Sequence, residues 1–380
     1  MENFDYLFTI VTISIFISLF LAVFLVTVSS KNKLSNRLFA LFLVLTTIDV
    51  SGFLYQPAAG EMSNLAMFRN LVIFLQLPTL YLYILSASYT NFILKWKHLL
   101  HVLSFVLVNL VFVPRFYLAN TSEKISFLSD FKNVFEVQFN HVFLHVQVAF
   151  YIVLIFLALR KAKKLYLQNY TGNSLQSHQW LFQLSVAITI FYVLALVKNI
   201  FKFSTNDDVS DQITIGLYVL NLVIICWYLF KALHHPTLFK SVNSNLKLVE
   251  TIISEEKKKS TATVDNITSN AELQKLQAYM KTEKPFLNAS LTIQDVSDAI
   301  DIPVRELSVL INHTLEQHFF DFVNSYRIKK AQELLIDTTD TKRTVLEILY
   351  EVGFNSKSSF NTAFKKHTGV TPTAYRKNNS

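Results

Sequence analysis

The amino-acid sequence predicts an all-α fold in two parts: a seven-helix transmembrane bundle, then a smaller all-α domain with two helix-turn-helix units. Two observations carry this prediction. Of the 380 residues, 52% are hydrophobic, more than in an ordinary soluble domain, and the long apolar runs end near residue 235. From residue 271 onward, short amphipathic segments with helical periodicity replace them. The predicted divisions are residues 1–235 for the bundle, 236–270 for a junction and 271–380 for the helical domain.

Seven apolar stretches are long enough to cross a bilayer, which takes about 20 residues of helix. Glu2 and Asp5 stand where a cleaved signal peptide would carry basic residues, so the first stretch is expected to be retained. The predicted spans are Tyr6 to Val28, Leu38 to Gln56, Leu71 to Leu94, Leu99 to Val113, Val142 to Leu159, Leu181 to Phe201 and Ile213 to Phe230.

Loop charges predict the orientation of these spans. Every charged residue in the first, third and fifth loops is basic; these residues are Lys31, Lys33, Arg37, Lys95, Lys97, Arg160, Lys161, Lys163 and Lys164. The intervening loops mix acidic and basic residues. Because basic loops stay on the cytoplasmic side, we expect the N-terminus outside and everything beyond Lys231 in the cytoplasm.

Polar residues within the spans indicate a candidate ligand pocket, since they are costly inside a bilayer. The candidates are Asp49, Arg69, Asn70, Lys198 and Asn221. The alternative is that Arg69 and Lys198 reach the outer headgroups and that Asp49 is paired or protonated. His141 and His145 stand one helical turn apart, but without a third ligand nearby we expect packing or interfacial roles and no metal site.

The junction combines two patterns. Apolar residues from Leu238 to Ile253 recur at helical spacing, which fits either a helix that pairs in a dimer or one that lies on the membrane surface. The polar stretch Ser254 to Asn270 has no periodicity and predicts a flexible linker.

The C-terminal segment contains an internal repeat. LTIQDVSDAIDIPVRELSVLI from Leu291 and TVLEILYEVGFNSKSSFNTAF from Thr344 each read as helix, tight turn, helix. The repeat aligns apolar positions that would lock the two helices of each unit together: Ile293 with Val345, Val296 with Ile348, Ile300 with Val352, Ile302 with Phe354 and Leu307 with Phe360.

In a helix-turn-helix the second helix enters the major groove, so its outward face identifies candidate contacts. At 100° per residue, Arg305, Ser308, Val309 and Asn312 share one arc of the first unit's second helix. In the second unit Ser356 is a natural N-cap, and the exposed arc carries Lys357, Ser358, Asn361, Thr362 and Lys365, backed by Phe360, Ala363 and Phe364. No acidic residue follows Glu351, whereas Lys365, Lys366, Arg376 and Lys377 do, which suits DNA phosphates.

The segment from about Leu273 to Arg376 resembles the AraC/XylS-type DNA-binding domain. The resemblance rests on FFDFVNSYRIKKAQELL and EVGFNSKSSFNTAFKKHTGVTPTAYR, which match the family's linking helix and second unit. It implies two recognition helices in successive major grooves about 34 Å apart, with base contacts at Arg305, Ser308, Val309, Lys357, Ser358, Asn361 and Thr362. Phosphate contacts are expected at Asn312, Lys365, Lys366 and Arg376. The first 235 residues look like the membrane half of membrane-bound members.

Two residues depart from that family pattern. Glu316 stands where the first unit's turn usually has glycine, so it must adopt a left-handed conformation at a cost of about 1 kcal/mol or shift the turn. Leu349 replaces a usual small residue at a helix crossing.

The composition argues against other classes. With 6 glycines and one cysteine, Cys226, the chain contains no GxGxxG, GxxxxGK[ST] or CxxC motif, so no cofactor is expected. We also see no HExxH, GxSxG or paired-carboxylate pattern that would indicate an enzyme. A transporter or channel with a regulatory tail is the main alternative, and an anchor that releases the DNA reader on proteolysis is another.

The sequence therefore predicts a multi-pass regulator in the bacterial inner membrane with its DNA-binding domain in the cytoplasm. The net charge of +8 fits anionic partners. The expected partners are double-stranded promoter DNA, the lipid bilayer, RNA polymerase, a second copy of the chain and an unidentified small-molecule or envelope signal.

Overall fold

The computed structural model describes residues 2–28, 32–54, 63–89, 92–171, 174–203, 207–234, 266–337 and 343–379. The chain divides into two compact units, Met1–Arg160 with Gln179–Ser241, and Lys161–His178 with Val242–Ser380. Most of the described residues are helical. Tyr170 and Thr292 form an isolated antiparallel β-bridge. The all-α prediction is confirmed for this part of the chain.

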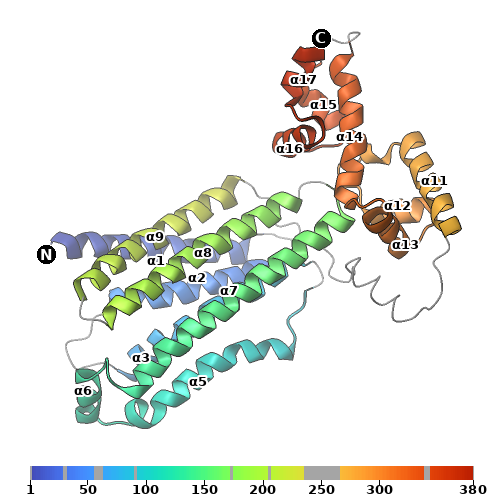
Figure 1. The fold of residues 1–380 in the computed structure, drawn as a ribbon. Coiled ribbons are helices and arrows are strands. Elements are labelled where there is room, and N and C mark those ends of the chain that lie inside the picture. Colours follow the sequence, from blue (N-terminus) through green and yellow to red (C-terminus); the bar gives the residue numbers. More distant parts are fainter. Residues whose placement is uncertain are drawn as a thin grey trace. The chain divides into compact units, whose positions relative to one another are not determined.

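The first unit is built from helices, several of them long (Figure 1). Its described elements are α1 (Glu2–Thr27), α2 (Lys33–Val50), η1 (Ser51–Phe53), α3 (Asn64–Leu71), η2 (Val72–Leu75), α4 (Gln76–Ser88), η3 (Trp96–Val102), α5 (Leu103–Phe112), η4 (Val113–Tyr117), α6 (Thr121–Ser129), α7 (Phe135–Asn169), α8 (Ser174–Lys202) and α9 (Asp207–His234).

Seven described helical segments are long and apolar enough to cross a membrane, judged by length and composition alone. Each overlaps one of the seven predicted spans. The segments are Tyr6–Thr27, Lys33–Phe53, Asn64–Ser88, Trp96–Tyr117, Phe135–Asn169, His178–Lys202 and Asp208–Lys231. Their insertion into a bilayer stays a prediction.

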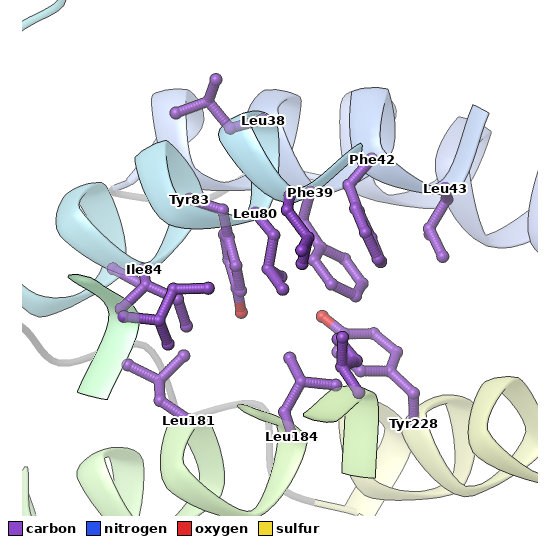
Figure 2. Close-up of a cluster of buried hydrophobic side chains, with 14 of the residues drawn as sticks. Leu38, Phe39, Phe42, Leu43, Leu80, Tyr83, Ile84, Leu181, Leu184 and Tyr228 are labelled. Atoms are coloured by element: carbon purple, nitrogen blue, oxygen red, sulfur yellow. The ribbon is translucent and has the colours of Figure 1, made fainter. Parts of the chain in front are cut away.

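The core of the first unit joins helices from both ends of the bundle sequence. Helix α2 packs against α1 and α4, and α1 also packs against α9. Figure 2 shows buried side chains from α2, α4, α8 and α9 converging on one cluster. The ring of Phe39 lies 4.7 Å from that of Tyr83 and 4.3 Å from that of Tyr228, centroid to centroid, so aromatic contacts fix α2 against α4 and α9.

Three features of this unit differ from the sequence prediction. The third span begins at Asn64, earlier than predicted, and changes from α-helix to 3₁₀-helix and back between Leu71 and Gln76. A short helix, α6, occupies the fourth loop, where Asn120 and Glu123 form a capping box. Helix α7 continues to Asn169, ten residues past the predicted end at Leu159, because no glycine or proline interrupts its polar last turns.

The second unit contains residues 161–178, which include the end of α7 and the start of α8, and seven further described α-helices. The elements C-terminal to the bundle are α11 (Asn266–Thr282), η5 (Pro285–Leu287), α12 (Ile293–Ile300), α13 (Val304–Val309), η6 (Leu310–Thr314), α14 (Phe319–Ile336), α15 (Val345–Glu351), α16 (Lys357–Thr368) and α17 (Pro372–Asn379). The predicted junction helix, Leu238 to Ile253, lies outside the described residues. The predicted linker reaches too far, since α11 already begins at Asn266.

Each helix-turn-helix unit has its own hydrophobic core. One core gathers α11, α12, α13 and the start of α14, and the other gathers the end of α14 with α15 and α16. The aligned apolar positions of the repeat are confirmed as core residues: all are buried except Val345, which is partly buried against the second core. Because α14 supplies side chains to both cores, it fixes the two helix-turn-helix units relative to each other.

Candidate nucleic-acid interface

The turn of the second helix-turn-helix depends on Gly353. Its φ of +88° lies in the left-handed region, and a Cβ at this position would stand 2.5 Å from the Phe286 carbonyl oxygen and 2.8 Å from that of Leu287. Only glycine allows so close an approach of backbones. The backbone of η5 therefore positions the turn that aims α16.

Hydrogen bonds at the helix starts fix where α16 and its partner α15 begin. The Ser356 hydroxyl accepts from the backbone N–H of Ser359 at 3.2 Å, which confirms the predicted N-cap of α16. Thr344 and Glu347 form a capping box at the start of α15. Hydrogen bonds from Thr344 hold the pKa of the Glu347 carboxyl below its ordinary value.

Helix α16 presents the face that its periodicity predicts. Phe360, Ala363 and Phe364 are buried in the second core. On the opposite side Lys357, Ser358, Thr362 and Lys365 are exposed, and Asn361 is half-buried. The exposed side thus offers an ammonium, hydroxyls and an amide, the groups that hydrogen-bond to base edges and phosphates. Their contact with DNA stays a prediction.

Two of the predicted phosphate contacts have protein partners. Lys366 Nζ lies 2.6 Å from Asp321 Oδ1, so this ion pair ties α16 to the start of α14. Arg376, on α17, is half-buried and also interacts within the protein. Lys365 is exposed. Burial, with Lys366 nearby, lowers the pKa of His367, which favours its neutral form at pH 7.

The first helix-turn-helix unit differs from the prediction at Ser308. We predicted this residue as a base contact, but only 2% of it is exposed. Ser308 lies in the regular part of α13, and the Asn312 amide, one turn later in the π-turn Leu310–Thr314, folds back to donate to the Ser308 carbonyl at 2.9 Å. Ser308 is therefore withdrawn as a base contact.

The other predicted contact residues of the first helix-turn-helix unit differ in exposure. Arg305 is exposed on α13, and Val309 is half-buried. Asn312, predicted to contact phosphate, is half-buried and engaged with Ser308 and with His318 at 3.3 Å. Glu316 has a φ of +51°, which confirms the left-handed conformation expected where the family has glycine. Leu349 is fully buried, so the second core accommodates the larger side chain.

Sequence reasoning missed Arg327, whose side chain is buried between the two cores. Its Nε donates to the Phe286 carbonyl at 2.7 Å and its Nη2 to the Asn288 carbonyl at 2.8 Å, while its guanidinium carbon lies 5.5 Å from the Phe354 ring centroid. Burial lowers the pKa of Arg327 to about 10, which leaves it charged at pH 7. The signal was available: Arg327 stands four residues from both Val323 and Ala331, on the apolar stripe of α14.

Residues 161–178 contact the same region within the second unit. The Thr171 hydroxyl donates to the Leu291 carbonyl at 2.6 Å, and Arg327 Nη2 lies 3.4 Å from that hydroxyl oxygen. The ring of Tyr166, near the end of α7, lies 6.4 Å from that of Phe320 on α14. The fifth loop of the sequence thus contributes to the first helix-turn-helix unit, which no local motif predicts.

The residues predicted to form a ligand pocket divide into two groups. Asp49, Lys198 and Asn221 line one cavity of about 190 Å³ in the first unit. Arg69 and Asn70 do not line it; they lie on α3, where the Arg69 guanidinium donates to the Asn70 amide oxygen at 3.1 Å. His145 also lines the cavity and hydrogen-bonds to Asn199 at 3.1 Å, whereas the ring of His141 packs against that of Phe203.

Comparison with known proteins places the similarity in the second unit. Residues 296–378 match the family model of a helix-turn-helix domain. The melibiose operon regulatory protein of Escherichia coli K12 is 28% identical over 88 residues, which are 23% of this chain and 28% of that protein. An uncharacterized HTH-type transcriptional regulator of Bacillus subtilis, YdeC, is 32% identical over 90 residues, 24% of this chain and 30% of its own length.

Among solved structures, the C-terminal domain of AraT, a response regulator from Geobacillus stearothermophilus, is 31% identical and has a TM-score of 0.24. That match covers 28% of this chain and 82% of the AraT domain. This chain spans less than a third of the length of the two curated relatives described above. The sequence similarities support an AraC-type, DNA-binding transcription regulator.

Proposed function

We propose that this chain is a membrane-anchored transcription regulator that binds promoter DNA sequence-specifically through two helix-turn-helix units and responds to a signal received by its helical bundle. The observation that carries the proposal is α16: a well-capped helix, aimed by the Gly353 turn, whose exposed side is basic and polar and whose other side is core. A helix presented in this way suits the major groove.

The surface of the first unit supports the membrane anchor. Large apolar side chains project outward along its long helices; Phe16 is 69% exposed, Phe20 60% and Leu110 62%. Contiguous exposed apolar surface is unfavourable in water, whereas a bilayer solvates it. The same helices satisfy their backbone hydrogen bonds internally, as hydrocarbon requires.

Helix α7 supports a route for the signal. It is continuous from Phe135 to Asn169 and carries cavity residue His145 as well as Tyr166, which contacts Phe320. A ligand that favours one position of α7 would shift the equilibrium of the segment that meets α14. The bundle would then control DNA access, RNA polymerase contact or pairing of two chains.

The test is selection of DNA sites from a genomic library by the fragment from Asn266 to Ser380. This fragment contains both hydrophobic cores of the second unit. We expect enrichment of a site with two half-sites about one helical turn apart, and salt-dependent affinity. The control is the double variant Lys357→Ala/Ser358→Ala, which should lose the enrichment. Failure to enrich any site, both alone and when fused to a dimerisation module, would contradict the proposal.

A further inference from the structure

The cavity in the first unit joins polar groups from five helices. Asp49 comes from α2, Gln76 from α4, His145 from α7, Lys198 from α8 and Asn221 from α9. Gln76 is buried and fixed at both ends of its amide: the Tyr192 hydroxyl donates to Gln76 Oε1 at 2.7 Å, and Gln76 Nε2 donates to Asp49 Oδ2 at 3.1 Å. The Asp49 carboxyl is therefore held in one orientation before any ligand arrives.

Asp49 and Lys198 line this cavity without pairing with each other. Among the described residues neither forms an ion pair within the 4.0 Å limit, and Lys198 Nζ has no hydrogen-bond partner there. Leaving opposite charges apart at a partly buried site costs free energy that direct contact would recover. The separation is consistent with a site in which something else lies between the two groups.

We propose that this cavity binds a small zwitterion of the α-amino acid class, with its ammonium group on Asp49 and its carboxylate on Lys198; the inference rests on the proposed sensing role of the bundle. Each charge of such a ligand would meet an opposite charge of the lining. Asn221 and Tyr218 add an amide and a hydroxyl to the lining, while Val148 and Leu217 supply apolar walls for an aliphatic side chain.

The volume restricts the ligand to a small molecule. A cavity of 150 Å³ accommodates benzene in another protein, so about 190 Å³ suits an amino acid the size of alanine or valine. Larger ligands, such as aromatic amino acids or disaccharides, exceed this space. The charge pattern also disfavours simple sugars, which would leave both Asp49 and Lys198 without a counter-ion.

The experiment measures thermal unfolding of the full chain in lipid nanodiscs with added compounds. L-valine and L-alanine should raise the melting temperature in a concentration-dependent manner, because a ligand that binds only the folded state stabilises it. Isobutylamine, which lacks the carboxylate, and isobutyrate, which lacks the ammonium, should produce no shift at the same concentrations. Glycerol controls for a general solute effect.

Variants identify the two charges. Asp49→Asn and Lys198→Gln should each raise the valine concentration needed for half the effect by about tenfold to a hundredfold, the loss expected for one charged hydrogen bond. Lys202→Gln, one helical turn further along α8 and outside the cavity lining, is the matched control and should leave it unchanged. Ala195→Leu keeps both charges but fills the cavity, so it should also weaken the response and carries the test if a charge variant fails to fold.

Absence of a shift with every small zwitterion, or equal shifts in wild type, Asp49→Asn, Lys198→Gln and Ala195→Leu, would overturn the inference. This readout involves no DNA. Failure of the isolated second unit to select DNA would contradict the regulator, whereas failure here with intact DNA selection would contradict only the ligand site.

Discussion

On α16, residues on the two sides of the helix are expected to have different roles: one side stabilises the fold, and the other is proposed to contact DNA. Phe360 and Phe364 hold the helix on the core, while Lys357 and Ser358 stand in solvent at its N-terminal end. That end is the part of a recognition helix that contacts base edges. Substitutions on the exposed side should therefore change DNA binding without changing folding.

Lys357→Ala is predicted to weaken binding to the selected site by about 1–3 kcal/mol and to weaken binding to random DNA by less, because a base contact is lost only where its base is present. Lys377 is also exposed. Lys377→Ala is therefore the control and should weaken binding to both DNAs equally. Titrations of the purified variants against the two DNAs measure this. Equal losses for Lys357→Ala on both DNAs would reassign that residue to phosphate contact.

Gly353→Ala and Gly369→Ala form a matched pair at positive φ. At Gly369, φ is +80° and a Cβ would meet nothing within 4 Å, so alanine should cost about 1–2 kcal/mol. At Gly353 the Cβ would also collide with the Phe286 and Leu287 carbonyls, so the cost should exceed about 3 kcal/mol. Urea unfolding of the fragment measures both. Similar losses at the two positions would show that η5 does not constrain the turn.

At the scale of elements, periodicity predicted the long helices and the two repeats well. Where apolar residues recur regularly, as along α8 or through Ile348, Val352 and Phe360, burial follows the sequence. The prediction was wrong where contacts beyond one helix face decide burial. Ser308 lies on the predicted outer arc of α13 but is buried, with the Asn312 amide folded back onto its carbonyl, and the period of one helix does not report such contacts.

The capping box of α15 joins Thr344 and Glu347, and its electrostatic effect can be tested. Hydrogen bonds from Thr344 lower the pKa of Glu347 from its ordinary value of 4.5. A lowered folded-state pKa contributes stability above the unfolded-state pKa, and that contribution is lost as the pH falls through the folded-state pKa. The cap should therefore stabilise the domain fully at pH 6 and progressively less below about pH 4.5.

Glu347→Gln removes this titration. The difference in unfolding free energy between wild type and Glu347→Gln should thus be largest near pH 6 and should shrink as the pH is lowered to 3. Urea unfolding of the fragment across that range measures it. Glu283→Gln, outside any capping box, controls for the general loss of a carboxylate. A difference that stays constant with pH would mean that the Glu347 charge adds nothing to the cap.

At the scale of the whole molecule, the sequence predicted two parts because apolar content changes abruptly near residue 235. The sequence also predicted Asp49, Lys198 and Asn221 as residues of one ligand pocket, and these three residues line the same cavity. It could not predict Gln76 or His145 beside them, since a polar residue in an apolar run does not reveal which neighbouring helix it faces. Nor could it predict that Thr171, 156 positions from Arg327, would contact it, because such contacts depend on tertiary packing.

The central claim is that one chain spans a membrane and reads DNA on its cytoplasmic side. Its most direct test is DNA binding by sealed membrane vesicles that contain the full chain. Inside-out vesicles, which expose the cytoplasmic face, should bind DNA that carries the selected site. This binding should be lost when the chain carries Lys357→Ala/Ser358→Ala. Right-side-out vesicles should bind no DNA until they are permeabilised. Equal binding by both orientations, or recovery of the chain in the soluble fraction alone, would contradict the account.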